Sequence, residues 1–101
     1  GIEPGIQFLT NNQDIFKRKE AEINILSKLF RDPDMNACIQ LLLWNTKMHP
    51  DSWQSLLELG SAYKENGDLS LAETTVFKAQ QINPENSEIL NLLNEIKNEN
   101  K

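Results

Sequence analysis

The chain has 101 residues, of which 39% are hydrophobic and 25% charged, and its formal net charge is −5. This length supports one domain with a modest core, and no apolar run reaches the roughly 18 residues that suggest a membrane-spanning helix. The acidic balance argues against a nucleic-acid partner, because phosphate recognition needs clustered Lys and Arg side chains. We therefore expect neither nucleic-acid binding nor direct membrane insertion.

Start and stop signals predict about six helices in chain order. Pro4 suits the first turn of a short helix over residues 3–11. Five more helices are predicted over residues 17–30, 35–47, 53–65, 69–82 and 85–98. Pro33 ends the second helix, because the residue before a proline disfavours the helical conformation, and Pro50 and Pro84 lie in later connectors. No segment alternates with period two, so the predicted fold class is all-α.

Residues 34 positions apart match in type over two successive segments. The matched pairs include Asp34 with Asp68, Leu42 with Val76, Met48 with Ile82, and Pro50 with Pro84. A fixed period of this length is typical of stacked helix pairs, each of which needs a neighbour to bury its apolar face. Such repeats form binding surfaces, so the sequence predicts an interaction function without naming the partner.

The stretch from Trp53 to Asn86 resembles a tetratricopeptide repeat (TPR). The residues that carry the resemblance are Leu56, Leu59, Gly60, Tyr63, Gly67, Asp68, Ala72, Val76, Ala79 and Pro84. Leu56 replaces the family's usual first aromatic residue. The resemblance implies a right-handed α-α superhelix of TPR-like helical hairpins, in which small residues such as Gly60 allow helices to approach closely.

We expect one TPR-like domain over residues 1–101. Its predicted parts are an N-terminal helix and linker (1–16), a degenerate repeat (17–52), a well-matched repeat (53–86) and a capping helix (87–101). The first repeat is degenerate because Leu26 stands at the family's glycine position, and Cys38 and Asn45 stand at alanine positions. The single Cys38 has apolar neighbours and is expected to be a buried structural thiol. The chain starts with Gly rather than Met, which suggests a piece of a longer protein.

Catalytic and cofactor-binding residues are not expected in this chain. His49 is the one histidine, and no Ser or Cys stands at a motif spacing from it. One His and one Cys do not provide the ligands of a metal site. Asp32 and Asp34 lack the glycine and terminal glutamate of a calcium loop. We therefore predict a non-catalytic chain without a cofactor that binds a protein or peptide.

In the TPR family the first helix of each pair lines a concave groove. By this resemblance, the protein-binding residues are expected to be Ile23, Ser27, Phe30, Leu57, Ser61, Lys64 and Asn91. Alternatively, the apolar residues among them fill contacts with the N-terminal helix. Ile23 and Ser27 stand where family members that grip a C-terminal carboxylate have Lys and Asn. That carboxylate clamp is therefore absent, and capture of chaperone tails is not expected.

A second, narrower resemblance covers most of the chain from Phe16 onward. Its residues are Phe16, Glu22, Ile23, Asn24, Leu26, Asn45, the run His49-Pro50-Asp51-Ser52-Trp53, Leu59, Gly60, Ala62 and Tyr63. They are similar to a helical tail that follows bacterial serine-hydrolase domains of the β-lactamase-like, penicillin-binding and esterase types. This resemblance implies an appendage that stabilises or positions an attached hydrolase, with Trp44 either structural or docked on the hydrolase body.

The two resemblances leave the compartment and the oligomeric state open. A hydrolase appendage implies a periplasmic or membrane-anchored parent protein, whereas a plain scaffold leaves the cytoplasm equally open. A third alternative is self-association of the chain through an uncovered end of the repeat stack.

Overall fold

The computed structural model describes the backbone of residues 13–99 and the side chains of residues 19–99. Within this range the chain forms five helices and no strand. They are α2 (Gln13–Phe30), α3 (Met35–Met48), α4 (Trp53–Glu65), α5 (Leu69–Ile82) and α6 (Ser87–Glu99). The predicted all-α class is confirmed. The first predicted helix, residues 3–11, lies outside the described residues.

Three helices begin where a polar side chain can cap them. The side chains of Asp34, Ser52 and Asn86 each accept a hydrogen bond from the backbone N–H three residues later, at 3.1–3.2 Å. These bonds satisfy first-turn donors that have no partner within the helix. Because Asn86 is the cap, α6 begins two residues later than the sequence predicted. In contrast, α2 begins at Gln13, four residues earlier than predicted.

The turn between α4 and α5 is a Schellman-type cap. Gly67 has a φ of 86°, in the left-handed region that glycine adopts without a steric penalty. The Asp68 N–H donates to the Tyr63 carbonyl at 2.9 Å, and the Gly67 N–H donates to the Lys64 carbonyl at 3.0 Å. Both bonds satisfy carbonyls at the end of α4, so the local sequence determines where this helix ends.

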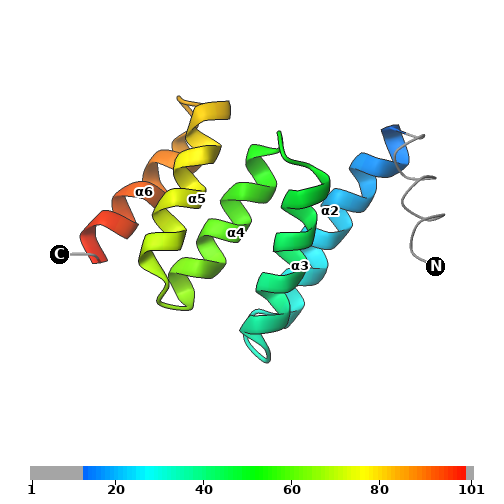
Figure 1. Ribbon diagram of the computed structural model, residues 1–101, viewed down its shortest axis with the longest axis horizontal. Coiled ribbons are helices and arrows are strands. Elements are labelled where there is room, and N and C mark those ends of the chain that lie inside the picture. Colours follow the sequence, from blue (N-terminus) through cyan, green and yellow to red (C-terminus); the bar gives the residue numbers. More distant parts are fainter. Residues whose placement is uncertain (1–12, 100–101) are drawn as a thin grey trace.

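Successive helices run antiparallel and lie side by side in a row (Figure 1). Each helix contacts the next one in the chain, and in addition α2 contacts α4 and α4 contacts α6. The first helices of the hairpins, α2, α4 and α6, therefore form one layer. The second helices, α3 and α5, lie in the other layer, and their backbones do not approach each other closely.

Two apolar clusters on either side of α4 form the core. One cluster joins α4, α5 and α6 and consists of Leu56, Leu57, Ala72, Val76, Ala79, Ile89, Leu92, Leu93 and Ile96. The other joins α3 and α4 and consists of Cys38, Ile39, Leu42, Leu59 and Ala62. Tyr63 packs against both clusters. Cys38 is fully buried, which agrees with the prediction of a structural thiol.

Gly60 marks a close approach of α4 to α5. A methyl group added at its Cα would overlap Cγ2 of Val76 and would lie 3.5 Å from the carbonyl oxygen of Ala72. The second hairpin therefore requires a residue without a side chain at this position. Leu26 stands at the matching position of α2 and is 41% exposed, so the first hairpin does not bury this position.

Candidate protein-binding surfaces

The seven residues predicted to bind protein lie on α2, α4 and α6, but they differ in exposure. Ser27 and Leu57 are buried, and the Ser27 hydroxyl donates to the Asn24 carbonyl at 2.7 Å. Ile23, Ser61 and Lys64 are half-buried, whereas Phe30 and Asn91 are exposed. Ser27 and Leu57 thus present almost no surface to a partner. Protein binding by the seven residues stays a prediction.

Ion pairs cross the layer formed by α2, α4 and α6. Arg31, just after α2, reaches two carboxylates of α4 at 3.5 and 3.8 Å, and Lys64 of α4 reaches two carboxylates of α6 at 3.4 and 3.6 Å. The acidic partners are Glu58 and Glu65 for Arg31, and Glu95 and Glu99 for Lys64. The Arg31 and Lys64 side chains are only 18% and 20% exposed, whereas three of the four glutamates are 45–60% exposed, so solvent still screens most of these pairs. They do, however, link Arg31 and Lys64 to acidic side chains of the neighbouring helix.

A polar cluster lies where α2, α3 and α4 meet. Asn45 of α3 is fully buried, and its Nδ2 lies within hydrogen-bond distance of the Glu20 carbonyl (3.1 Å), Asn24 Oδ1 (2.9 Å) and Ser55 Oγ (3.4 Å). The Ser55 hydroxyl donates to the Glu20 carboxylate at 2.5 Å. Asn45 stands where the TPR pattern has alanine. Its Nδ2 links three helices, whereas its buried Oδ1 has no hydrogen-bond partner among the described residues.

His49 lies at the C-terminal end of α3, beside this polar cluster. Its backbone N–H donates to the Asn45 carbonyl at 2.9 Å. Burial lowers the pKa of the His49 side chain from its ordinary value, and the charge of Glu20 opposes this shift. Within the described part of the chain, no group of three or more His, Cys, Asp or Glu side chains could hold a metal ion.

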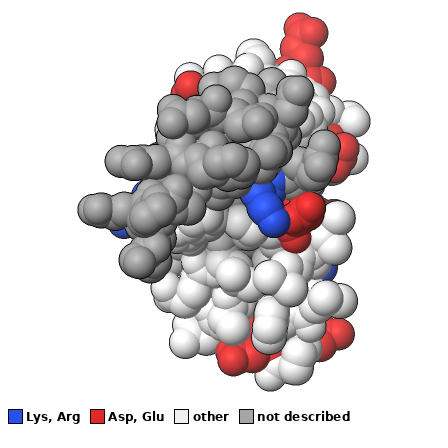
Figure 2. Space-filling view, turned by 90° about the vertical axis from the view of Figure 1, so that its right-hand side faces the viewer, with Lys and Arg blue, Asp and Glu red and all other residues white. Residues whose placement is uncertain are grey.

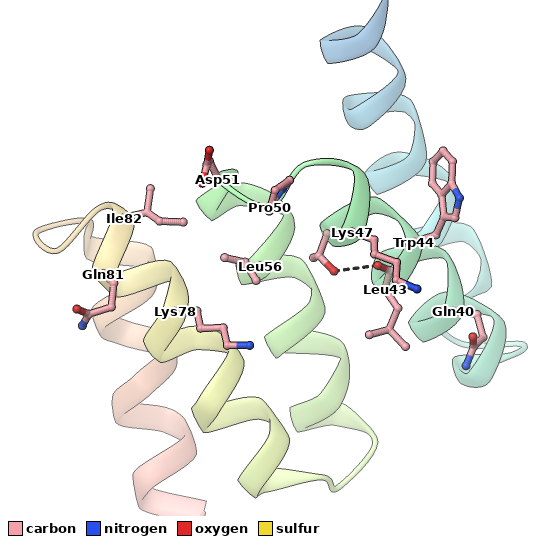
Figure 3. Close-up of a pocket in the computed structure, with 11 residues that line it drawn as sticks. Gln40, Leu43, Trp44, Lys47, Pro50, Asp51, Leu56, Lys78, Gln81 and Ile82 are labelled. Carbon is pink, nitrogen blue, oxygen red and sulfur yellow. Dashed lines mark hydrogen bonds between the residues drawn. The ribbon is translucent and has the colours of Figure 1, made fainter. Parts of the chain in front are cut away.

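A groove of about 840 Å³ lies between α3 and α5 (Figure 3). Its apolar lining is Leu43, Trp44, Pro50, Leu56 and Ile82, and its polar lining is Gln40, Thr46, Lys47, Asp51, Lys78 and Gln81. Leu43 and Trp44 are each 37% exposed. Both side chains are open to solvent because α5 does not approach α3 on this side.

A second apolar surface, the end face, lies on α2. The end face consists of Ile25, Leu26, Leu29 and Phe30. Ile25 is 63% exposed and Leu29 is 69% exposed. Figure 2 views the molecule from the end where α2 and α3 lie, and below the grey atoms most of the visible surface belongs to uncharged residues. The repeat equivalent of Ile25 is Leu59, which belongs to the α3–α4 core cluster, and that of Leu29 is Tyr63, which packs against this cluster.

Sequence analysis identified only part of the groove between α3 and α5. Trp44 was a candidate docking residue through the resemblance to hydrolase tails, which left it either structural or docked on the hydrolase body. Lys47 and Lys78 gave no such signal. They come together at one groove only through the packing of α3 and α5 on α4.

No helix between residues 13 and 99 combines the length and the apolar character needed to cross a bilayer. The sequence matches no family model and no curated protein. The likeness to TPR repeats and the likeness to hydrolase tails therefore depend on the residues of this chain alone.

Proposed function

We propose that this chain is a non-catalytic protein-binding or interdomain-binding module of a larger protein, built as a right-handed α-α superhelix of TPR-like hairpins. The support is that helices one period apart in the sequence lie next to each other, α2 beside α4 and α4 beside α6. The Arg31–Glu65 ion pair, at 3.5 Å, joins residues separated by 34 positions. Repeats that stack in register form the extended surfaces typical of scaffold proteins.

The end face of α2 is the observation that carries this proposal. Ile25 and Leu29 are apolar and exposed, whereas their repeat equivalents Leu59 and Tyr63 pack against α3. We infer that one further helix, from a partner or from another part of the parent protein, packs on the end face. Burying each large apolar side chain there would contribute about 1.5–3 kcal/mol.

Photo-crosslinking from the end face tests this function. A photoreactive phenylalanine analogue is placed at Leu29 of the full-length protein in its native cells, and crosslinked products are identified by mass spectrometry. A matched control carries the analogue at Asn98, an exposed residue of α6. We expect position 29 to crosslink to a partner or to another domain, and position 98 to give much less product.

Two outcomes would contradict the end face as a binding surface. Equal crosslinking at positions 29 and 98 would show no preference for the end face. Crosslinks from position 29 only to residues 1–12 of the same chain would show that the N-terminal segment covers it.

A second candidate is an appendage that stabilises or positions an attached bacterial serine hydrolase. The observation that favours it is the exposed Trp44 beside the groove, a large apolar side chain available to dock on a hydrolase body. The test is the melting temperature and turnover of the parent with and without this segment. Removal should lower the melting temperature and leave turnover nearly unchanged. A parent without a hydrolase domain would exclude this candidate.

A further inference from the structure

The groove between α3 and α5 contains basic side chains that are not neutralised within the molecule. Lys47 and Lys78 are exposed and line the groove, and neither has an ion-pair partner among the described residues. In the other layer Lys28, Arg31 and Lys64 pair with glutamates, and Lys97 of α6 is the one described lysine there without an ion pair. A chain with a net charge of −5 thus leaves two free ammonium groups at one groove.

Apolar surface lies between these two lysines. Leu43 belongs to the α3 side and Ile82 to the α5 side, and Leu56 of α4 lies between them at the base of the groove (Figure 3). Leu43 is 37% exposed and Ile82 is 41% exposed. Exposed apolar side chains beside unpaired cations suit a partner that has both apolar and acidic groups.

We propose that this groove binds a segment of another protein in which acidic residues flank one or two large apolar side chains. The apolar side chains occupy the space over Leu56, and the carboxylates pair with Lys47 and Lys78. Asp51 lies at one end of the groove beside Pro50 and repels acidic groups there (Figure 3). This inference depends on the proposed protein-binding function and names the chemistry of one partner.

The first test is an unbiased selection. A library of random twelve-residue peptides is selected on the immobilised chain, and the enriched sequences are read. We expect enrichment of peptides that combine Asp or Glu with Leu, Phe or Trp. One enriched peptide is then synthesised, and its affinity should fall as salt is raised, because salt screens exposed charge pairs.

The chain has its own reporter of binding at this groove. It contains two tryptophans, Trp44 in the groove lining and Trp53 in α4. In a Trp53→Phe variant the fluorescence comes from Trp44 alone. Peptide binding in the groove should shift the Trp44 emission to shorter wavelength and reduce its quenching by acrylamide.

Charge reversal distinguishes this groove from other surfaces. We expect Lys47→Glu with Lys78→Glu to weaken binding of the selected peptide by about tenfold or more, with a smaller loss in the Lys47→Ala, Lys78→Ala pair. Lys97→Glu is the control, because Lys97 is also exposed, has no ion pair among the described residues and lies on α6. It should change the affinity less than twofold. Thermal melting verifies that each variant is folded.

Three outcomes would overturn the groove proposal. The first is enrichment of peptides without acidic residues, and the second is binding that the lysine reversals leave unchanged. The third is no enrichment at all, in which case crosslinking from Leu29 still tests separately whether the chain binds protein.

Loss of binding in Ile25→Glu with Leu29→Glu would place the peptide site on the end face, and the protein-binding function would then stand without the groove.

Discussion

At the residue scale, the packing around Gly60 leaves no space for a side chain. Gly60→Ala would favour the helix locally, but its methyl group would overlap Cγ2 of Val76. Val76 is β-branched, so its side chain has few alternative rotamers. We expect the variant to lose about 1–3 kcal/mol of unfolding free energy, measured by urea denaturation.

The partner of Gly60 provides the control. Val76→Ala removes the methyl groups that the new side chain would meet, so adding it to Gly60→Ala should cost less than the sum of the two single changes. A double-mutant cycle measures this coupling. An unchanged unfolding free energy in Gly60→Ala alone would show that α4 and α5 do not approach closely at this position.

His49 links the stability of the chain to pH. Its folded-state pKa is lowered by burial, so the unfolded chain takes up a proton first as pH falls through about 6.5. The free energy of unfolding should therefore decrease from pH 7.5 to pH 5.5, and His49→Gln should remove this part of the decrease. A wild-type chain that gains stability over this range relative to the variant would contradict the lowered pKa.

At the element scale, Asn45 determines how firmly α2 is held. Its amide joins α3 to Glu20 and Asn24 of α2 and to Ser55 of α4. Asn45→Ala should cost about 1–3 kcal/mol, because it leaves buried polar groups without a partner. Hydrogen exchange should then accelerate in α2 more than in α5.

The neighbouring residue is a matched control for this change. Thr46→Ala removes a hydroxyl that donates only to the Leu43 carbonyl of the same helix, so its effect should stay within about 0.5 kcal/mol. If Asn45→Ala is equally mild, the polar cluster does not hold α2 in place.

At the scale of the whole molecule, the helices should fold as one cooperative unit. Ile89, Leu92, Leu93 and Ile96 of α6 are buried in the cluster shared with α4 and α5. A chain that ends at Asn86 would expose the α5 side of this cluster. We expect the truncated chain to lose more helical circular dichroism signal than the residues of α6 contribute, because each repeat needs a neighbour to bury its apolar face. A loss limited to α6 would mean that α2 to α5 fold independently.

Local chemistry allowed much of the fold to be predicted from the sequence. The caps at Asp34 and Ser52 and the glycine turn at Gly67 act within a few residues, so the ends of α4 and the start of α3 agreed with expectation. The starts of α2 and α6 differed from expectation. Helix α6 begins after Asn86, whose side chain caps it, and α2 extends four residues beyond its predicted start, to Gln13. Apolar spacing likewise identified α6 as a helix with one buried face.

The binding surfaces were decided by the tertiary structure. Ser27 and Leu57 were predicted to line a groove, yet the packing of α2, α4 and α6 buries them and pairs Lys64 with two glutamates. The groove with Lys47 and Lys78 exists because α3 and α5 both pack on α4 without meeting each other. Periodicity determines which face of a helix is apolar, whereas exposure depends on which helices lie beside that face and how closely they approach.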